Sequence, residues 1–321
     1  MRLREDSVFL RWNAGRDVIS DGTFLRWIET LEAIEGRPFA SWRALDRSGP
    51  ALELTPARRQ ELVVGLADGG TNPQHRFELT MDAPRRVMRV SFTAGAHPYT
   101  GRYVVGVDLR LVGAAFGVSA SAEPAGTDTG LVANTGVDPS ADVSVEAWVA
   151  RFRAWMLESA ALCGHAHDTD DDAMQNIVSP ALLRSGYGVD PETLPEDDRP
   201  GRELSRGEHR YAVNWLTWLG PEMAAQLDVA ALVERSGAGS GGAVVEHVPV
   251  DTSGPAAAAH VAPGEAPAQL GPAVFIRLYD KPSSCAAAEA RAVQRAVFDA
   301  LGIAELARRQ QRAFGFWQRK S

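Results

Sequence analysis

Three consecutive segments alternate apolar and polar residues: Phe77–Met81, Val87–Thr93 and Arg102–Leu111. Turn-forming stretches separate them at Asp82-Ala83-Pro84 and between Gly95 and Gly101. Successive side chains of a strand point to opposite faces, so this alternation predicts an antiparallel meander with one buried face and one wet face. The rest of the chain must then supply apolar surfaces that cover the buried face.

Helical spacing appears on both sides of this meander. After the candidate N-caps Ser20 and Asp21, one helical face carries Phe24, Trp27, Ile28, Leu31 and Ile34. The pair Thr55-Pro56 marks the start of a second helix. A third helix begins after Ser144, with its inward face formed by Val145, Trp148, Val149, Phe152, Trp155 and Met156.

The C-terminal part alternates strand-like and helix-like segments. Strands are predicted there at His209–Trp218, Ala243–Val250 and Ala273–Asp280, and further helices after Pro221 and Ser283. One more strand is predicted in the N-terminal part, at Val8–Trp12. The order predicts an α+β protein, with an antiparallel or mixed sheet flanked by helices on one side. We expect an N-terminal α+β half (1–160), an acidic loop segment (161–208) and a C-terminal α+β half (209–321). The last contains a flexible Gly/Ala/Pro-rich insertion at 236–272, and whether the halves are similar folds stays open.

Composition restricts the class of protein. The 321 residues carry a formal net charge of −8, which disfavours nucleic acid as the main partner. Two cysteines without metal-like spacing form no disulfide framework. The charged N-terminal stretch lacks a signal core, and no apolar run approaches a membrane span. We therefore expect a cytoplasmic protein that binds no membrane.

The negative charge is concentrated in one segment. Between His165 and Glu203 there are ten acidic residues and three arginines. Such a field can steer a basic partner, although acidic loops also serve solubility alone. The aspartates that we expect to meet a partner are Asp168, Asp170, Asp171, Asp172, Asp197 and Asp198.

Candidate catalytic motifs are weak. The cluster from His165 and His167 to Asp172 has metal-ligand chemistry. Its spacing does not match H-x-H-x-D-H of metallo-β-lactamase-like hydrolases, His-Glu-x-x-His, or the D-x-D-x-D-G of a calcium loop. A literal G-x-G-x-x-G at 237–242 is preceded by a helix and followed by a strand, so its context is the inverse of a dinucleotide site. We expect no catalytic residue, no metal and no cofactor.

The most distinctive stretch is Asn214-Trp215-Leu216-Thr217-Trp218-Leu219-Gly220-Pro221-Glu222. It resembles the N-W-L-x-[FW]-L-G-P-E segment of bacterial immunity proteins, namely immunity protein family 52 and related type VI secretion immunity proteins. The aromatic helix within 21–42 and the strand at 276–280 resemble the former as well. In physical terms the segment predicts a core strand with Trp215 and Trp218, a turn at Gly220 and the start of a helix at Pro221.

This resemblance implies a non-enzymatic antitoxin that binds a cognate toxin, of the nuclease type, and occludes its basic active-site cleft. Two other functions stay open on sequence grounds. One is a metal-dependent hydrolase that uses His165, His167 and nearby aspartates. The other is a structural or adaptor protein of a secretion apparatus.

Overall fold

The structure is a computed structural model that describes most of the chain. It covers residues 7–19, 21–44, 50–67, 75–83, 86–96, 103–113, 144–168, 212–230, 243–250, 271–282 and 288–306, and the single positions Asp171, Ala181, Arg184, Asp190, Glu192, Leu232 and Arg309. Within these residues no helix has both the length and the apolar character of a bilayer span.

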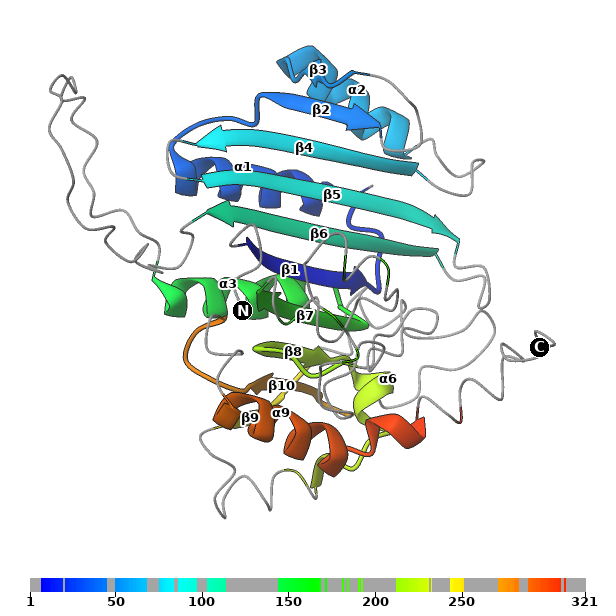
Figure 1. Cartoon of the computed structure of the whole chain (residues 1–321). Helices are drawn as coiled ribbons and strands as arrows, with labels where there is room; N and C mark the ends of the chain where they lie inside the picture. The colour runs from blue at the N-terminus through cyan, green and yellow to red at the C-terminus, as the bar shows by residue number, and fades with distance from the viewer. Residues whose placement is uncertain are drawn as a thin grey trace, which may run out of the picture.

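One ten-stranded sheet organises the described chain, in the order β3-β2-β4-β5-β6-β1-β7-β8-β10-β9 (Figure 1). Its strands are β1 Ser7–Ala14, β2 Ser41–Ala44, β3 Leu52–Glu53, β4 His75–Ala83, β5 Arg86–Ala96, β6 Tyr103–Gly113, β7 Cys163–Asp168, β8 Leu216–Leu219, β9 Val244–Val248 and β10 Ala273–Arg277. Every neighbouring pair is antiparallel. The predicted α+β class and the 77–111 meander are confirmed.

The first strand in the sequence occupies the middle of the sheet. β1 pairs with β6 on one side and with β7 on the other. The N-terminal meander and the C-terminal strands are therefore hydrogen-bonded into one sheet through β1 rather than lying in separate sheets. Side chains from both parts of the chain therefore lie on the same two faces of one sheet.

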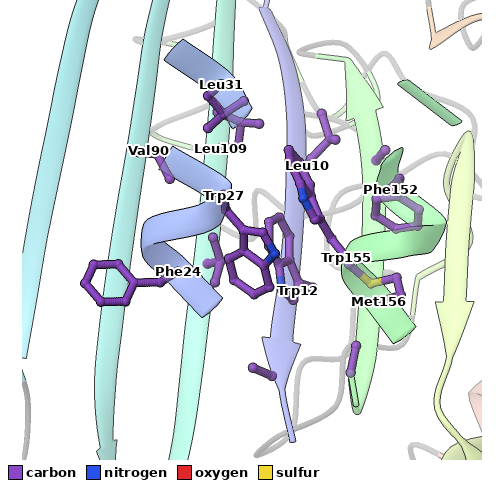
Figure 2. Packing of buried hydrophobic residues seen from close by; sticks show 14 of the residues in the cluster. Leu10, Trp12, Phe24, Trp27, Leu31, Val90, Leu109, Phe152, Trp155 and Met156 are labelled. Atoms are coloured by element: carbon purple, nitrogen blue, oxygen red, sulfur yellow. The ribbon is translucent and has the colours of Figure 1, made fainter. Parts of the chain in front are cut away.

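One face of the sheet packs against α1 (Thr23–Glu35) and α3 (Val145–Glu158). Figure 2 shows the centre of this layer, where Trp12 of β1 meets Trp27 of α1 at 5.3 Å and Trp155 of α3 at 5.5 Å between ring centroids. Apolar side chains at alternate positions of β4, β5 and β6 complete the layer. Burial of such large rings is the main stabilising contribution here.

Helices also lie on the opposite face, at the C-terminal end of the sheet. α9 (Ala288–Ala300) and the short α6 (Pro221–Ala224) pack with Val274 and Ile276 of β10 in a second core. The intervening Phe275 contacts Phe152 of α3 on the first face, at 6.5 Å between rings. The expectation of helices on one side is therefore wrong, because β10 alternates between two apolar layers.

Helix starts follow the predicted chemistry in two of three cases. Ser144 Oγ accepts a hydrogen bond from the amide of Ala147, and Thr55 Oγ1 accepts one from the amide of Arg58 at the start of α2 (Pro56–Ala67). α1 differs, because Gly22 is its N-cap with a left-handed φ of 73°. Glycine adopts this conformation without the strain of a Cβ atom.

The expected loop segment 161–208 begins with regular structure. Cys163–Asp168 form β7, which is buried between β1 and β8. The sequence does not predict this strand, because two of its buried residues are histidines. The run of apolar residues that is typical of a buried strand is therefore missing. The helix predicted from Pro221 through Leu227 and Leu232 is interrupted, since α6 ends at Ala224 and the chain is helical again only at Val229.

Candidate interaction surface

A second surface is created where the sheet lacks a helical cover. Among the described residues, no helix packs on the face of β2, β4, β5 and β6 that is opposite to α1 (Figure 1). At β1 and β7 the same face is covered, because Phe9, His165 and His167 are buried there. Exposed side chains on it include Arg89, and Arg43 at 47% exposure. Cross-strand register arranges its residues into two rows that run across the strands.

The first of these rows, here called the paired row, has compensated charges. It contains Arg43, Glu78, Asp108, Arg11 and His165 in strand order. Arg43 forms an ion pair with Glu78 at 2.7 Å, and Arg11 forms one with Asp108 at 2.8 Å. Opposite charges at directly opposed positions stabilise a sheet modestly, so this row is explained by the fold itself.

The adjacent row, here called the arginine row, is different. Its members, each directly opposite the next, are Ser41, Thr80, Arg89, Arg110, Phe9 and His167. Arg89 of β5 faces Arg110 of β6, which places two positive charges at one cross-strand pair. Arg89 is exposed and makes no hydrogen bond or ion pair with any described residue.

Phe9 organises the cationic end of the arginine row. The guanidinium carbon of Arg11 lies 4.4 Å from its ring centroid and that of Arg110 lies 5.3 Å away. The Phe9 ring also stacks against the ring of His167, its cross-strand neighbour on β7, with centroids 5.3 Å apart. Cation–π contacts of this kind hold both guanidinium groups in a defined position beside the ring.

A buried polar cluster lies on the same side of the sheet, between β8 and α9. We call it the Asp171 cluster. The carboxylate of Asp171 accepts hydrogen bonds from Asn214 Nδ2 at 2.7 Å, from Arg291 at 2.8 Å and from Gln294 Nε2 at 3.1 Å. Its side chain is 0% exposed. The prediction that Asp171 belongs to a solvated acidic surface is therefore wrong, because a buried carboxylate with three donors cannot meet a partner.

The other predicted contact residues lie in different situations. Asp168 ends β7, is half-buried, and accepts a hydrogen bond from the amide of Asp171 at 2.8 Å. Four further aspartates fall outside the described residues: Asp170, Asp172, Asp197 and Asp198. For these four, contact with a partner stays a prediction.

His165 and His167 occupy alternate positions of β7 and so share one face of the sheet. Both are buried, at 1% and 0% exposure. His167 Nδ1 lies 3.2 Å from the carbonyl oxygen of Asp168. In the part of the chain that the structure describes, they join no group of three or more His, Cys, Asp or Glu residues that could hold a metal ion.

The distinctive tryptophan segment is part of the core. Trp215 Nε1 donates to the carbonyl of Tyr279 at 2.9 Å, and Trp218 Nε1 donates to the carbonyl of Ala161 at 3.1 Å. A Cβ atom on Gly220 would lie 2.6 Å from the carbonyl oxygens of both Ala161 and Leu162. Pro221 starts α6. Trp218 and Gly220 therefore hold β8 against the segment that follows α3, and Trp215 bonds to the segment that follows β10. All four residues are buried, so none is a surface contact.

Sequence reasoning does not reveal the arginine row. Arg89 and Arg110 occupy polar positions of the predicted meander, where a solvated face is the ordinary explanation. Arg89 lies opposite Arg110 only because of the register between β5 and β6. Phe9 lies beside Arg110 only because β1 pairs with the edge of β6 that β5 leaves open. Neither pairing leaves a signal in a single sequence.

Comparison with known proteins adds little. No protein-family model matches the chain, and no curated protein matches it. Among solved structures, it is similar to a T6SS protein of Pseudomonas aeruginosa, at 12% sequence identity and a TM-score of 0.48, over 93% of this chain and 73% of that chain. These values are too low to carry a conclusion about function.

Proposed function

We propose that this chain is an immunity protein, which binds a cognate protein toxin and neutralises it by occluding the toxin's active site. The observation that carries the proposal is the broad sheet face that no described helix covers, with its arginine row and paired row. An exposed polar sheet face suits contact with a macromolecule, whereas small-molecule sites are concave and mostly apolar.

The tryptophan segment adds support of a different kind. The residues that resemble the N-W-L-x-[FW]-L-G-P-E segment of immunity proteins are fixed by backbone contacts in the core. A shared segment with this role supports a shared scaffold, while the contact surface of each protein can differ. We therefore base the proposed family on the tryptophan segment and the proposed contact on the surface.

The acidic segment has a part in the proposal. Asp168, Asp170, Asp172, Asp197 and Asp198 carry negative charge that can approach the cationic cleft of a nuclease-type toxin. Steering of this kind raises the association rate and weakens with salt. Asp171 is left out because its charge is compensated by Arg291.

Co-expression tests the proposal. The chain is expressed together with the product of the adjacent upstream gene, and the complex is isolated by size-exclusion chromatography with light scattering. We expect a stable 1:1 complex, and we expect the upstream product to stop growth when it is expressed alone. An upstream product from an unrelated toxin locus serves as the control. Absence of both complex and toxicity would contradict the proposal.

A further inference from the structure

We propose that the outer edge of β9 pairs with the β9 edge of a second copy of this chain, so that two sheets join into one across a two-fold axis. β9 is the last strand in the order of the sheet, and among the described residues β10 is the one strand that pairs with it. Figure 1 shows β9 at the end of the sheet opposite to β2 and β3. The outer edge of such a strand presents backbone N–H and C=O groups, which form a template for another strand.

The two ends of the sheet differ in how their edges are protected. At the other end, β3 comprises only Leu52 and Glu53, and a short edge strand is one of the ways in which proteins prevent edge-to-edge pairing. β9 has five residues, three of them valines, and contains neither proline nor lysine. Its first residue, Val244, is 47% exposed. We therefore place the contact at β9 rather than at β3.

Side chains of β9 alternate between the two helical layers. Val248 belongs to the core that α3 covers, and Glu246 forms an ion pair with Arg153 of α3 at 2.9 Å. The intervening positions face the other way, since Val245 packs with the core that α9 covers. In a dimer whose two-fold axis is perpendicular to the sheet, the α3 layers of both copies lie on one side. Residues that oppose each other across the new pair must then come from the same layer.

One register meets this requirement and uses all five residues of β9. It is centred on Glu246, and it places Val244 opposite Val248 of the partner subunit and Val245 opposite His247 of the partner subunit. The exposed Val244 then gains an apolar cross-strand neighbour. A register centred on Val245 or on His247 would instead place a valine opposite Glu246. The sequence of the strand is therefore self-complementary about Glu246.

The charges at the axis support the same register. Glu246 would lie opposite Glu246 of the partner subunit, and like charges at directly opposed positions destabilise a sheet. Here each carboxylate brings its own cation, because Arg153 binds Glu246, and its guanidinium carbon is also held 5.1 Å from the ring centroid of Phe275. The side chains of Arg153 and Glu246 are 36% and 40% exposed, so both can reach across the axis. Two arginines and two glutamates then form a neutral, symmetric cluster.

Sedimentation equilibrium tests the contact on the whole chain. We expect the average mass to rise from one chain towards two between micromolar and millimolar concentration, since a contact limited to one strand edge is small and associates weakly. Val244→Lys should raise the dissociation constant of the dimer about tenfold, because the new charge appears at two symmetric positions. Leu157→Lys is the matched control, since Leu157 is 39% exposed on α3 and gains the same charge. A wild type that stays monomeric throughout, or equal weakening by both substitutions, would overturn the inference.

Disulfide cross-linking tests the register. Directly opposed residues of an antiparallel pair lie close enough for a disulfide, whereas residues four positions out of register do not. We expect Glu246→Cys to form a covalent dimer in glutathione buffer, in a Cys285→Ser background where the remaining native thiol, Cys163, is buried. Val244→Cys is the control, because this position is exposed at the same edge but does not oppose itself. Equal or faster cross-linking of Val244→Cys would mean random collision and would rule out the proposed pairing.

A further variant separates a closed dimer from an open polymer. If β9 paired with the β3 edge of another copy, the contact would be head-to-tail and would continue beyond two chains. Leu52→Lys changes the exposed apolar residue of β3. We expect this variant to dimerise like the wild type. Masses above two chains that disappear in Leu52→Lys would contradict the symmetric contact.

The inference and the proposed function can fail independently. The face proposed to contact a toxin lies on β2, β4, β5 and β6, towards the other end of the strand order. A dimer through β9 would leave this face open in both copies, so that a one-to-one complex would contain two chains of each protein. If the chain dimerises through β9 but binds no toxin, the proposed function fails and the inference stands. If a toxin binds and the free chain stays monomeric, the reverse holds.

Discussion

Asp171 and Arg291 form an ion pair at 2.8 Å between residues that are 120 positions apart in the sequence. The carboxylate is fully buried, and the guanidinium side chain is 11% exposed. Gln294 shares the carboxylate and also donates to the carbonyl of Val213 at 2.6 Å. The Asp171 cluster thereby ties the chain just after β7 to both β8 and α9.

Removal of Arg291 should destabilise the protein strongly. In Arg291→Met the carboxylate of Asp171 stays buried without its cation, and we expect a loss of about 3–5 kcal/mol in the free energy of unfolding. Urea denaturation measures this loss. The control is Arg153→Met, because the pair of Arg153 with Glu246 is more exposed, at 36% and 40%, and should contribute less than about 1 kcal/mol. Equal losses in both variants would show that the buried pair stabilises the fold no more than the exposed one.

Gly220 should tolerate no side chain. Gly220→Ala places a Cβ atom 2.6 Å from two backbone carbonyl oxygens, so β8 must move away from the end of α3. Overpacking of this kind costs roughly 1–3 kcal/mol. Gly271→Ala is the matched control, since a Cβ atom on Gly271 would have nothing within 4 Å. Thermal unfolding of the two variants should therefore differ, and similar melting temperatures would contradict the close approach.

Asp21 should contribute to the acid sensitivity of the fold. Burial raises the pKa of its carboxyl, but hydrogen bonds from Thr23 and the guanidinium groups of Arg16 and Arg26 outweigh this and lower the pKa below its ordinary value. Because the folded-state pKa is depressed, the stabilisation is present above the unfolded pKa of about 3.9 and is lost as the pH falls through the folded pKa.

Asp21→Asn should therefore reduce stability at neutral pH and weaken its dependence on pH below about 4. The free energy of unfolding is measured across the range from neutral to acidic pH in wild type and variant. Asp299→Asn, at an exposed position of α9, is the control for loss of an aspartate. Parallel pH profiles in wild type and Asp21→Asn would rule out this contribution.

Neutralising part of the acidic segment should slow association with the toxin. In Asp170→Asn/Asp172→Asn the negative field is reduced and Asp171 keeps its buried role, so we expect a slower association rate at low salt. The control is Glu289→Gln/Asp299→Asn, which removes two charges from exposed positions of α9. Stopped-flow kinetics distinguishes local steering from an effect of net charge, since equal slowing in both double variants would favour net charge.

The hydrolase alternative predicts bound metal. An immunity protein should contain far less than one equivalent of zinc or manganese after purification without chelator. Elemental analysis of wild type and of His165→Ala/His167→Ala measures this content. Near-stoichiometric metal in the wild type, lost in the double variant, would favour the hydrolase over the antitoxin.

The sequence predicts local structure better than it predicts neighbours in space. The spacing of Phe24, Trp27 and Leu31 predicts α1, and strict alternation predicts β4, β5 and β6, because one face of each element is apolar. β7 escapes prediction because its buried positions include His165 and His167, whose burial depends on neighbouring strands. Side-chain chemistry alone makes Asp171 look like a surface residue.

The site depends even more on tertiary pairing. Arg89, Arg110 and Phe9 belong to three strands, and their common row exists only because β1 lies beside β6 in a specific register. A shift of one residue would turn each of these side chains to the opposite face. The pattern of polar positions predicts a wet face, but the arrangement of charges on it requires the structure.

The central position of β1 also has a consequence during synthesis. β1 ends at Ala14, but its partner β7 ends only at Asp168. At translation rates of about 5–20 residues per second, one edge of β1 waits roughly 10–30 s for that partner. A nascent chain with an open edge invites wrong pairing or a holding chaperone. If the chain is an immunity protein, as proposed, it can protect the producing cell only after β7 has been translated.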